Sequence, residues 1–252
     1  MRLFLLLAVT VSAFAGVPTD VVGEDLPKAT PPKSAAFAFD DWLIVPLRVH
    51  LVSSNESPAL QTTLTEQDLA RILPKMNRVW AQAGIQFRIE SVIREEALSI
   101  EKGDVNGREE LPARMPSEGR SSTAFNAYYV KQLPVNGFYM QRGIFVKDTA
   151  SLRPVEGGID EPIPRVTSHE LGHALGLPHR QDRTNLMASG TTGTLLNDAE
   201  IAKARETAKT FAWIESAPAL RKRAEELRVA GKINDAEALD RVLSILPTAQ
   251  QP

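Results

Sequence analysis

The stretch HELGHALGLPH, residues 169–179, holds three of the four histidines in the chain. On a helix, His169 and His173 lie one turn apart on the same face, so both imidazoles can reach one ion. Gly176 follows His173 by three residues, where a backbone with positive φ would end the helix and turn the chain sharply. That turn can bring His179 back as a third ligand.

Three histidines leave the fourth position of a tetrahedral zinc ion to water. Glu170 sits beside the first ligand, where its carboxylate can reach that water rather than the metal. A closed structural site would use four protein ligands, usually thiolates, and the chain has no cysteine. The pattern therefore predicts a catalytic site for one Zn²⁺ ion. The alternative, a core helix with incidental histidines, would bury partly polar rings without partners at a high cost.

The same stretch resembles the long zinc-binding signature of the metzincin metallopeptidases, and its wording is most similar to matrixin-like members. Met187, eight residues past His179, looks like the Met-turn of that clan. The resemblance implies a zinc endopeptidase with ligands His169, His173 and His179, with Glu170 as general base and Met187 beneath the metal. It also implies an α+β, metzincin-like zincin fold, in which a zinc-binding active-site helix crosses below a twisted, mixed, five-stranded sheet.

In metzincins the strand before the loop to the zinc helix is an antiparallel edge that pairs with the substrate backbone. By resemblance, Gly143–Lys147 is the candidate here, and the alternative is a strand that only completes the sheet. Asn136-Gly137 is interpreted as a turn before it. The residues after Met187 are small and polar, which suits the wall of a specificity pocket. The predicted substrate-binding residues are Gly143, Ile144, Phe145, Val146, Ser189 and Gly190.

The amino-terminal residues 1–15 have the pattern of a secretory signal peptide, with Arg2 before an apolar run and small residues before a cleavage site after Ala15. The apolar run is too short for a membrane span, so we expect a secreted or periplasmic protein. Residues 16–40 are rich in proline and are predicted to be a disordered linker or short pro-segment. Asp40 or Asp41 could cap the zinc in a latent form, although a solvated terminus is favoured.

Residues 41–213 are predicted to form the catalytic domain. His50, the one histidine outside the motif, falls on a strand of alternating apolar and polar residues and is expected to pack there. Thr65 is expected to cap a following helix, which Pro74 would kink or whose start it would delay. Asn197 begins a capping box for another helix.

Residues 214–252 are predicted to form a C-terminal helical hairpin. It could pack back on the domain or associate with a partner or a second copy, and the sequence leaves the oligomeric state open. The net charge of −2 shows no excess of basic residues of the kind that nucleic-acid-binding proteins carry. We therefore expect no nucleic-acid partner. Glu109-Glu110 could bind calcium, as loops in matrixins do, but no interleaved Asp/Gly pattern supports this.

The expected partner is therefore a protein or peptide substrate. Two alternatives remain for function. One is a catalytically inactive zinc-binding and peptide-binding module of the same fold, and the other is a zinc hydrolase that acts on something other than peptides. The presence of all four chemical residues, His169, Glu170, His173 and His179, favours the peptidase.

Overall fold

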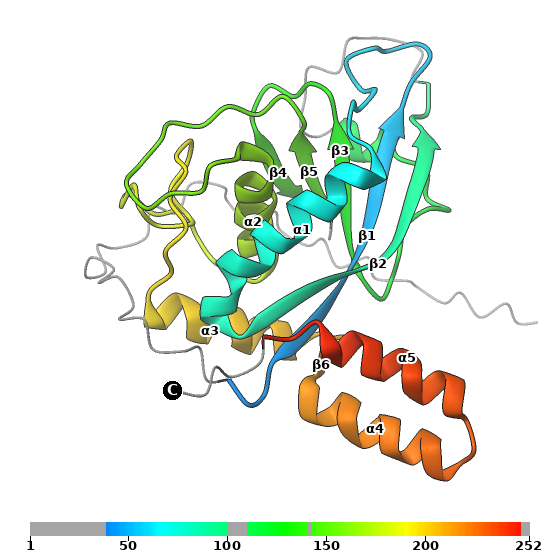
Figure 1. The fold of residues 1–252 in the computed structure, drawn as a ribbon. Coiled ribbons are helices and arrows are strands. Elements are labelled where there is room, and N and C mark those ends of the chain that lie inside the picture. Colours follow the sequence, from blue (N-terminus) through cyan, green and yellow to red (C-terminus); the bar gives the residue numbers. More distant parts are fainter. Residues whose placement is uncertain (1–38, 100–109, 141–142, 248–252) are drawn as a thin grey trace, which may run out of the picture.

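The computed structural model describes residues 39–99, 110–140 and 143–247 (Figure 1). The predicted signal peptide, residues 16–38 of the predicted linker and Glu109 lie outside these ranges. The strands are β1 (Leu43–Ser53), β2 (Ile85–Glu96), β3 (Phe125–Val130), β4 (Gly137–Met140), β5 (Gly143–Lys147) and β6 (Glu215–Ser216). The helices are α1 (Glu66–Trp80), α2 (Pro162–Ala174), α3 (Asp198–Lys209), α4 (Ala217–Val229) and α5 (Ile233–Ser244), with short 3-10 turns at Ala81–Ala83 and Leu111–Arg114.

The strands form one mixed sheet in the order β2-β1-β3-β5-β4, and the two-residue β6 pairs with β1. β1 runs parallel to β2 and β3, β3 runs parallel to β5, and β4 is antiparallel to β5. Helices α1 and α2 lie together against one face (Figure 1). The mixed sheet, the histidine-bearing helix and the helical hairpin confirm the predicted fold class, with β6 as a short addition to the expected five strands.

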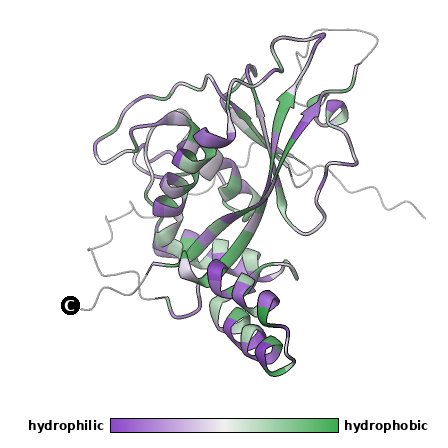
Figure 2. Cartoon of the chain, turned by 45° about the vertical axis from the view of Figure 1, so that its right-hand side comes forward, coloured by the Kyte–Doolittle hydropathy of each residue, from purple (hydrophilic) through white to green (hydrophobic). Residues whose placement is uncertain are grey.

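Alternation along the strands divides the apolar residues between two cores. In β1, Leu47, Val49 and Leu51 face α1 and α2 and belong to the main core. Val52 faces the other way and belongs to a second core, together with Tyr128 and other residues. Successive side chains of a strand point to opposite faces, so α2 packs on one side of the sheet and the second core on the other. Figure 2 shows the apolar residues running along these strands.

Local sequence signals set the ends of α1. Thr65 caps the helix by accepting from the Asp68 N–H. In return, the Thr65 N–H donates to the Asp68 carboxylate. Gly84 ends the following 3-10 turn with φ +59, the left-handed region that favours glycine. α1 begins at Glu66 and Pro74 lies inside it, so the second of the two alternatives, a delayed helix start, is wrong.

The edge of the sheet next to α2 differs from the prediction. β5 pairs with β3 on one side and with β4 on the other, so Gly143–Lys147 is an internal strand and the edge-strand prediction is wrong. Gly137, interpreted as part of a turn, begins β4. A four-residue strand that starts with glycine has too few alternating residues to be recognised, and its pairing with β5 is what defines it. The edge strand of the sheet beside α2 is therefore β4.

The C-terminal hairpin consists of α4 and α5 and lies below the sheet in the view of Figure 1. β6 pairs with Leu43 and Ile44 of β1, and Ser216 caps α4 by accepting from the Ala219 N–H. Gly231, with φ +74, follows α4 and turns the chain into α5. Within the described part of the chain, no helix has the length and apolar character needed to cross a membrane.

Candidate zinc site

Helix α2 carries the first two histidines, and its C-terminal turn sets the direction of the chain after them. Pro162 lies at its start, where proline costs no hydrogen bond. At the other end the Leu177 N–H donates to the Gly172 carbonyl, and the Gly176 N–H donates to that of His173. Gly176 has φ +82. These bonds form a Schellman motif, which confirms the predicted turn.

The three histidines of the motif come together around one point. The Nε2 atom of His173 lies 3.2 Å from that of His169 and 3.2 Å from that of His179, and ligand atoms of all three lie within 4.8 Å of one another. Zinc–nitrogen bonds of about 2.0–2.1 Å in a tetrahedron require nitrogens about 3.3–3.4 Å apart. The spacing of these atoms therefore fits one tetrahedral ion.

Backbone carbonyls fix which ring nitrogen faces the centre of the cluster. His169 Nδ1 lies 2.8 Å from the Leu186 carbonyl, and His173 Nδ1 lies 2.8 Å from that of Leu177. A carbonyl oxygen only accepts, so each Nδ1 donates and each Nε2 keeps a free lone pair in the neutral ring. Burial lowers the pKa of His169 well below its usual value and that of His173 to about 4. Both rings are therefore neutral, and each can offer the lone pair of its Nε2 atom to a cation.

The site is graded from interior to surface: His169 is buried, His173 half-buried and His179 exposed. A cation held by these rings would therefore face solvent on the His179 side, which leaves room for water and substrate. This is the donor set of an open site rather than a closed structural one.

Glu170 directly follows His169 on α2, and its side chain lies against Gly137, the first residue of the edge strand. It is 5% exposed, on the helical turn that carries both α2 ligands. A Cβ added to Gly137 at the start of β4 would come within 2.9 Å of Glu170 Oε1 and 2.7 Å of Val166 Cγ1. Gly137 thus allows the backbone of β4 to approach the carboxylate closely.

Met187 packs directly against α2. A Cβ added to Gly172 would come within 2.5 Å of Met187 Sδ, and Met187 is fully buried. The Met187 N–H donates to Asn185 Oδ1 at 2.7 Å, and the Met187 carbonyl accepts from the Arg180 N–H at 3.0 Å. The loop that contains Met187 is therefore joined to both the zinc helix and the segment just after His179.

Two buried charged residues that the sequence reasoning missed hold this loop. Arg165, on α2, donates to the carbonyls of Ala188 and Gly193 at 2.5 and 3.1 Å, and burial lowers its pKa to about 10. Glu200, on α3, accepts from Arg180 and Asn185. The capping-box pattern at Asn197 was the one sequence signal that marked Glu200, and no pattern marked Arg165.

The predicted substrate-binding residues lie on two different segments of the chain. Gly143, Ile144, Phe145 and Val146 are buried in the internal strand β5. Ser189 is exposed, and the Gly190 carbonyl accepts from the Arg153 N–H at 2.9 Å. Ser189 and Gly190 thus lie on the loop after Met187, which bonds the segment around Arg153.

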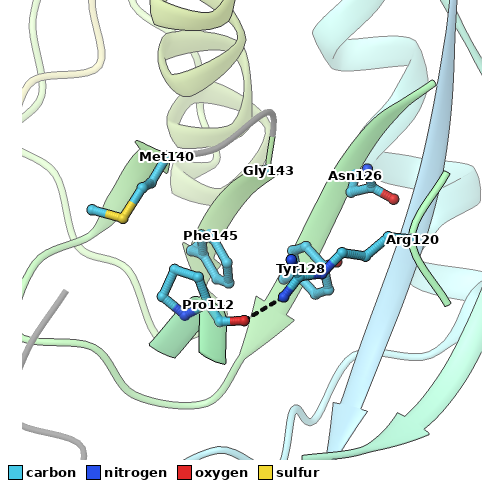
Figure 3. A pocket seen from close by; sticks show the side chains of 7 residues that line it. All are labelled: Pro112, Arg120, Asn126, Tyr128, Met140, Gly143 and Phe145. Carbon is cyan, nitrogen blue, oxygen red and sulfur yellow. Dashed lines mark hydrogen bonds between the residues drawn. The ribbon is translucent and has the colours of Figure 1, made fainter. Parts of the chain in front are cut away.

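A small pocket lies on the sheet face opposite α2. Its lining includes Phe145, Tyr128 and Arg120, which donates to the Pro112 carbonyl (Figure 3). His50 stacks on Tyr128 with ring centroids 4.1 Å apart and contacts Glu95 and Asn126 through its nitrogens. His50 therefore packs on a strand face, as predicted. Since the sheet separates this pocket from the histidines, it is not part of the zinc site.

Asp41 does not approach the histidines. Its carboxylate accepts from Arg205 at 2.5 Å and from Lys209 at 3.2 Å, both on α3. Two cations of α3 therefore hold Asp41, whose side chain is still 47% exposed.

Searches of protein-family models and of curated proteins gave no match. Among solved structures, the chain is similar to a promirolysin mutant from Tannerella forsythia (13% identity, 70% of this chain and 84% of that one, TM-score 0.46). It is also similar to archaemetzincin from Methanopyrus kandleri (15%, 66% and 96%, 0.42) and to metalloproteinase-II from Bacteroides fragilis (10%, 66% and 53%, 0.43). With identities and TM-scores this low, the functional proposal rests on the residues of this chain.

Proposed function

We propose that the chain is an exported zinc-dependent endopeptidase of the metzincin type, with one Zn²⁺ held by His169, His173 and His179. The observation that carries the proposal is the convergence of three Nε2 atoms, two of them 3.2 Å from the third. The buried Glu170 directly follows the first of these histidines in the sequence. The closer resemblance of this chain to matrixin-like members rests on the amino-acid sequence of residues 169–179 alone.

Zinc bound there would lower the pKa of a water and polarise the scissile carbonyl. Glu170 would take the proton of the attacking water and return it to the leaving amine, which is the work of a general base and then a general acid. The close approach of Gly137 to Glu170 brings the edge strand next to this carboxylate. Met187 would support the ligands from beneath, through its contact with Gly172 and its backbone bond to Arg180.

We further propose that the substrate backbone pairs with β4 rather than with β5. β4 has a strand partner on one side, β5, and no other strand among the described residues pairs with it. An extended peptide would add to the sheet on the side of β4 that faces away from β5. Ser189 and Gly190, on the loop after Met187, remain candidates for the wall of a specificity pocket, and calcium has no supporting observation.

The decisive experiment compares Glu170→Gln with His173→Ala in a quenched-peptide cleavage assay, with bound zinc measured by elemental analysis. We expect Glu170→Gln to keep one zinc per chain and lose about 10²–10⁴-fold in hydrolysis, the typical contribution of a general base. His173→Ala should lose both zinc and hydrolysis. Full activity in Glu170→Gln would refute the base. Zinc binding without any peptide cleavage by the unaltered protein would instead indicate the inactive peptide-binding module.

Export rests on the signal-peptide pattern of residues 1–15. Mass spectrometry of the mature amino terminus tests it, since cleavage after Ala15 should leave Gly16 as the first residue. An unprocessed protein that stays in the cytoplasm would contradict export without affecting the zinc assignment.

A further inference from the structure

The carboxylate of Glu200 is buried at the start of α3 and accepts three hydrogen bonds. The donors are Arg180 Nε at 2.6 Å, Asn185 Nδ2 at 2.8 Å and the Asn197 N–H at 2.9 Å. Glu200 is 1% exposed. A carboxylate taken out of water is costly unless it is paired and its lone pairs are satisfied, and here all three donors serve that purpose.

Each donor comes from a different part of the site. Arg180 directly follows His179, and Asn185 lies two residues before Met187 and accepts the Met187 N–H. Asn197 is the cap of α3 and accepts the Glu200 N–H at 2.9 Å. Glu200 therefore joins the segment of the third histidine, the loop of Met187 and the helix behind them.

Helix capping alone does not account for this arrangement. The capping box of α3 uses one carboxylate oxygen, Oε2, to accept from the Asn197 backbone. The other oxygen, Oε1, accepts from Arg180, and Oε2 accepts a second bond from Asn185. Both of these contacts are made to residues beside His179 and Met187, which the cap does not require.

We propose that Glu200 is a positioning residue that holds His179 and the Met187 loop in place against the two helical zinc ligands. The proposal rests on the proposed zinc site. His169 and His173 are fixed by α2 and by bonds from their Nδ1 atoms to carbonyls. His179 is the exposed ligand on a loop, so its position depends on the residues that anchor that loop, and Arg180 is the nearest of them.

The three donors also define what the position will tolerate. Glutamine would keep the volume of Glu200 but offers one acceptor oxygen and one NH₂ group. In one orientation the NH₂ group would face the donor of Arg180, and in the other it would face the donors of Asn185 and Asn197. It would also remove the charge that pairs with Arg180. Loss of a direct hydrogen-bond partner of a metal ligand typically weakens metal affinity about 10–100-fold. Glu200 acts on His179 through Arg180 rather than by a bond to the imidazole, and we expect Glu200→Gln to weaken zinc binding within the same range.

The test measures Zn²⁺ affinity by competition with a chromogenic chelator in the full chain, with Asn197→Ala as the matched control. Asn197→Ala removes the side-chain cap of α3 but leaves the bonds that Glu200 accepts from Arg180 and Asn185. We expect Glu200→Gln to weaken zinc binding about 10–100-fold and Asn197→Ala to change it less than about threefold. The visible absorption of the Co²⁺-loaded protein should also change in Glu200→Gln, because the ligand geometry changes.

Arg180→Met is a second variant that removes the main tie to His179 from the other side, and it covers the case in which Glu200→Gln does not fold. We expect it to weaken zinc binding as well, and the double variant to be no weaker than the poorer single one, since both act through one contact. Equal zinc affinity in Glu200→Gln, or in Arg180→Met, and the unaltered protein would overturn the role of Glu200. An equal loss in Asn197→Ala would reduce it to helix capping. If the unaltered protein binds no zinc, the proposed function itself fails.

Discussion

Replacing Gly172 by alanine tests whether Met187 supports the zinc helix. The added Cβ would lie 2.5 Å from Met187 Sδ and 3.1 Å from its Cε. Met187 is fully buried, so its side chain can relieve the contact only by displacing its neighbours in the core. Alanine should therefore overpack this position.

Two opposing effects set the expected size of the change. Glycine in a helix interior is less favourable than alanine by about 1 kcal/mol, which favours the substitution. Overpacking a close-packed core typically costs about 1–3 kcal/mol, which opposes it. The free energy of unfolding should thus fall by up to about 2 kcal/mol in Gly172→Ala. In a Met187→Ala background the contact is gone, and the same substitution should stabilise the protein by up to about 1 kcal/mol.

The assay is urea unfolding of the four proteins of this cycle in the presence of a chelator, with unfolding free energies compared at unchanged slope. The sign of the Gly172→Ala effect should reverse between the two backgrounds, with a coupling of about 1–3 kcal/mol. The same destabilisation in both backgrounds would refute the contact between Met187 and the helix.

Three further predictions follow from other contacts of the site and the core. Gly137→Val should keep zinc but lose most peptide hydrolysis, because its side chain would collide with Val166 and Glu170; retained activity with bound zinc would contradict the close approach of β4. Arg165→Met should lower the free energy of unfolding by about 3 kcal/mol or more in urea titrations, since it leaves buried carbonyls without donors; a change below about 1 kcal/mol would argue against its clamping role. Burial raises the pKa of Tyr128 and of Tyr129 to about 12, so the unfolded chain loses these protons first and stability should fall as pH rises from about 10 to 12. Tyr129→Phe should make that fall shallower, and an unchanged pH dependence would contradict the assignment.

Local patterns predicted the elements whose cause is local. The spacing of His169 and His173 and the turn at Gly176 follow from helix geometry and from the freedom of glycine to adopt positive φ. Thr65 was recognisable as an N-cap from its residue type and place before the helical pattern, and Asn197 from a capping box, which needs only residues three apart. Each of these signals lies within a few residues of the structure it produces, so the sequence alone is enough.

The elements that were mispredicted depend on partners distant in sequence. β4 has four residues, and its register is set by pairing with β5, so nothing in its own residues shows that it, rather than β5, forms the edge. Arg165 can be buried because it donates to the carbonyls of Ala188 and Gly193. Both residues lie more than twenty positions away in the sequence. A pattern method sees an arginine at a helix start and expects it to be solvated.

His179, the proposed third zinc ligand, lies between these two cases, because its placement has both a local and a distant cause. The Schellman turn directs the chain back toward the helix, but a turn alone leaves His179 on an exposed loop. The final placement comes from Arg180, which bonds Met187 through its backbone and Glu200 through its side chain. A zinc motif can therefore be complete in sequence and still depend on a carboxylate twenty-one residues beyond its last histidine. Zinc binding and the folding of α3 onto the site should accordingly be coupled, because a ligand that binds only the folded arrangement stabilises it.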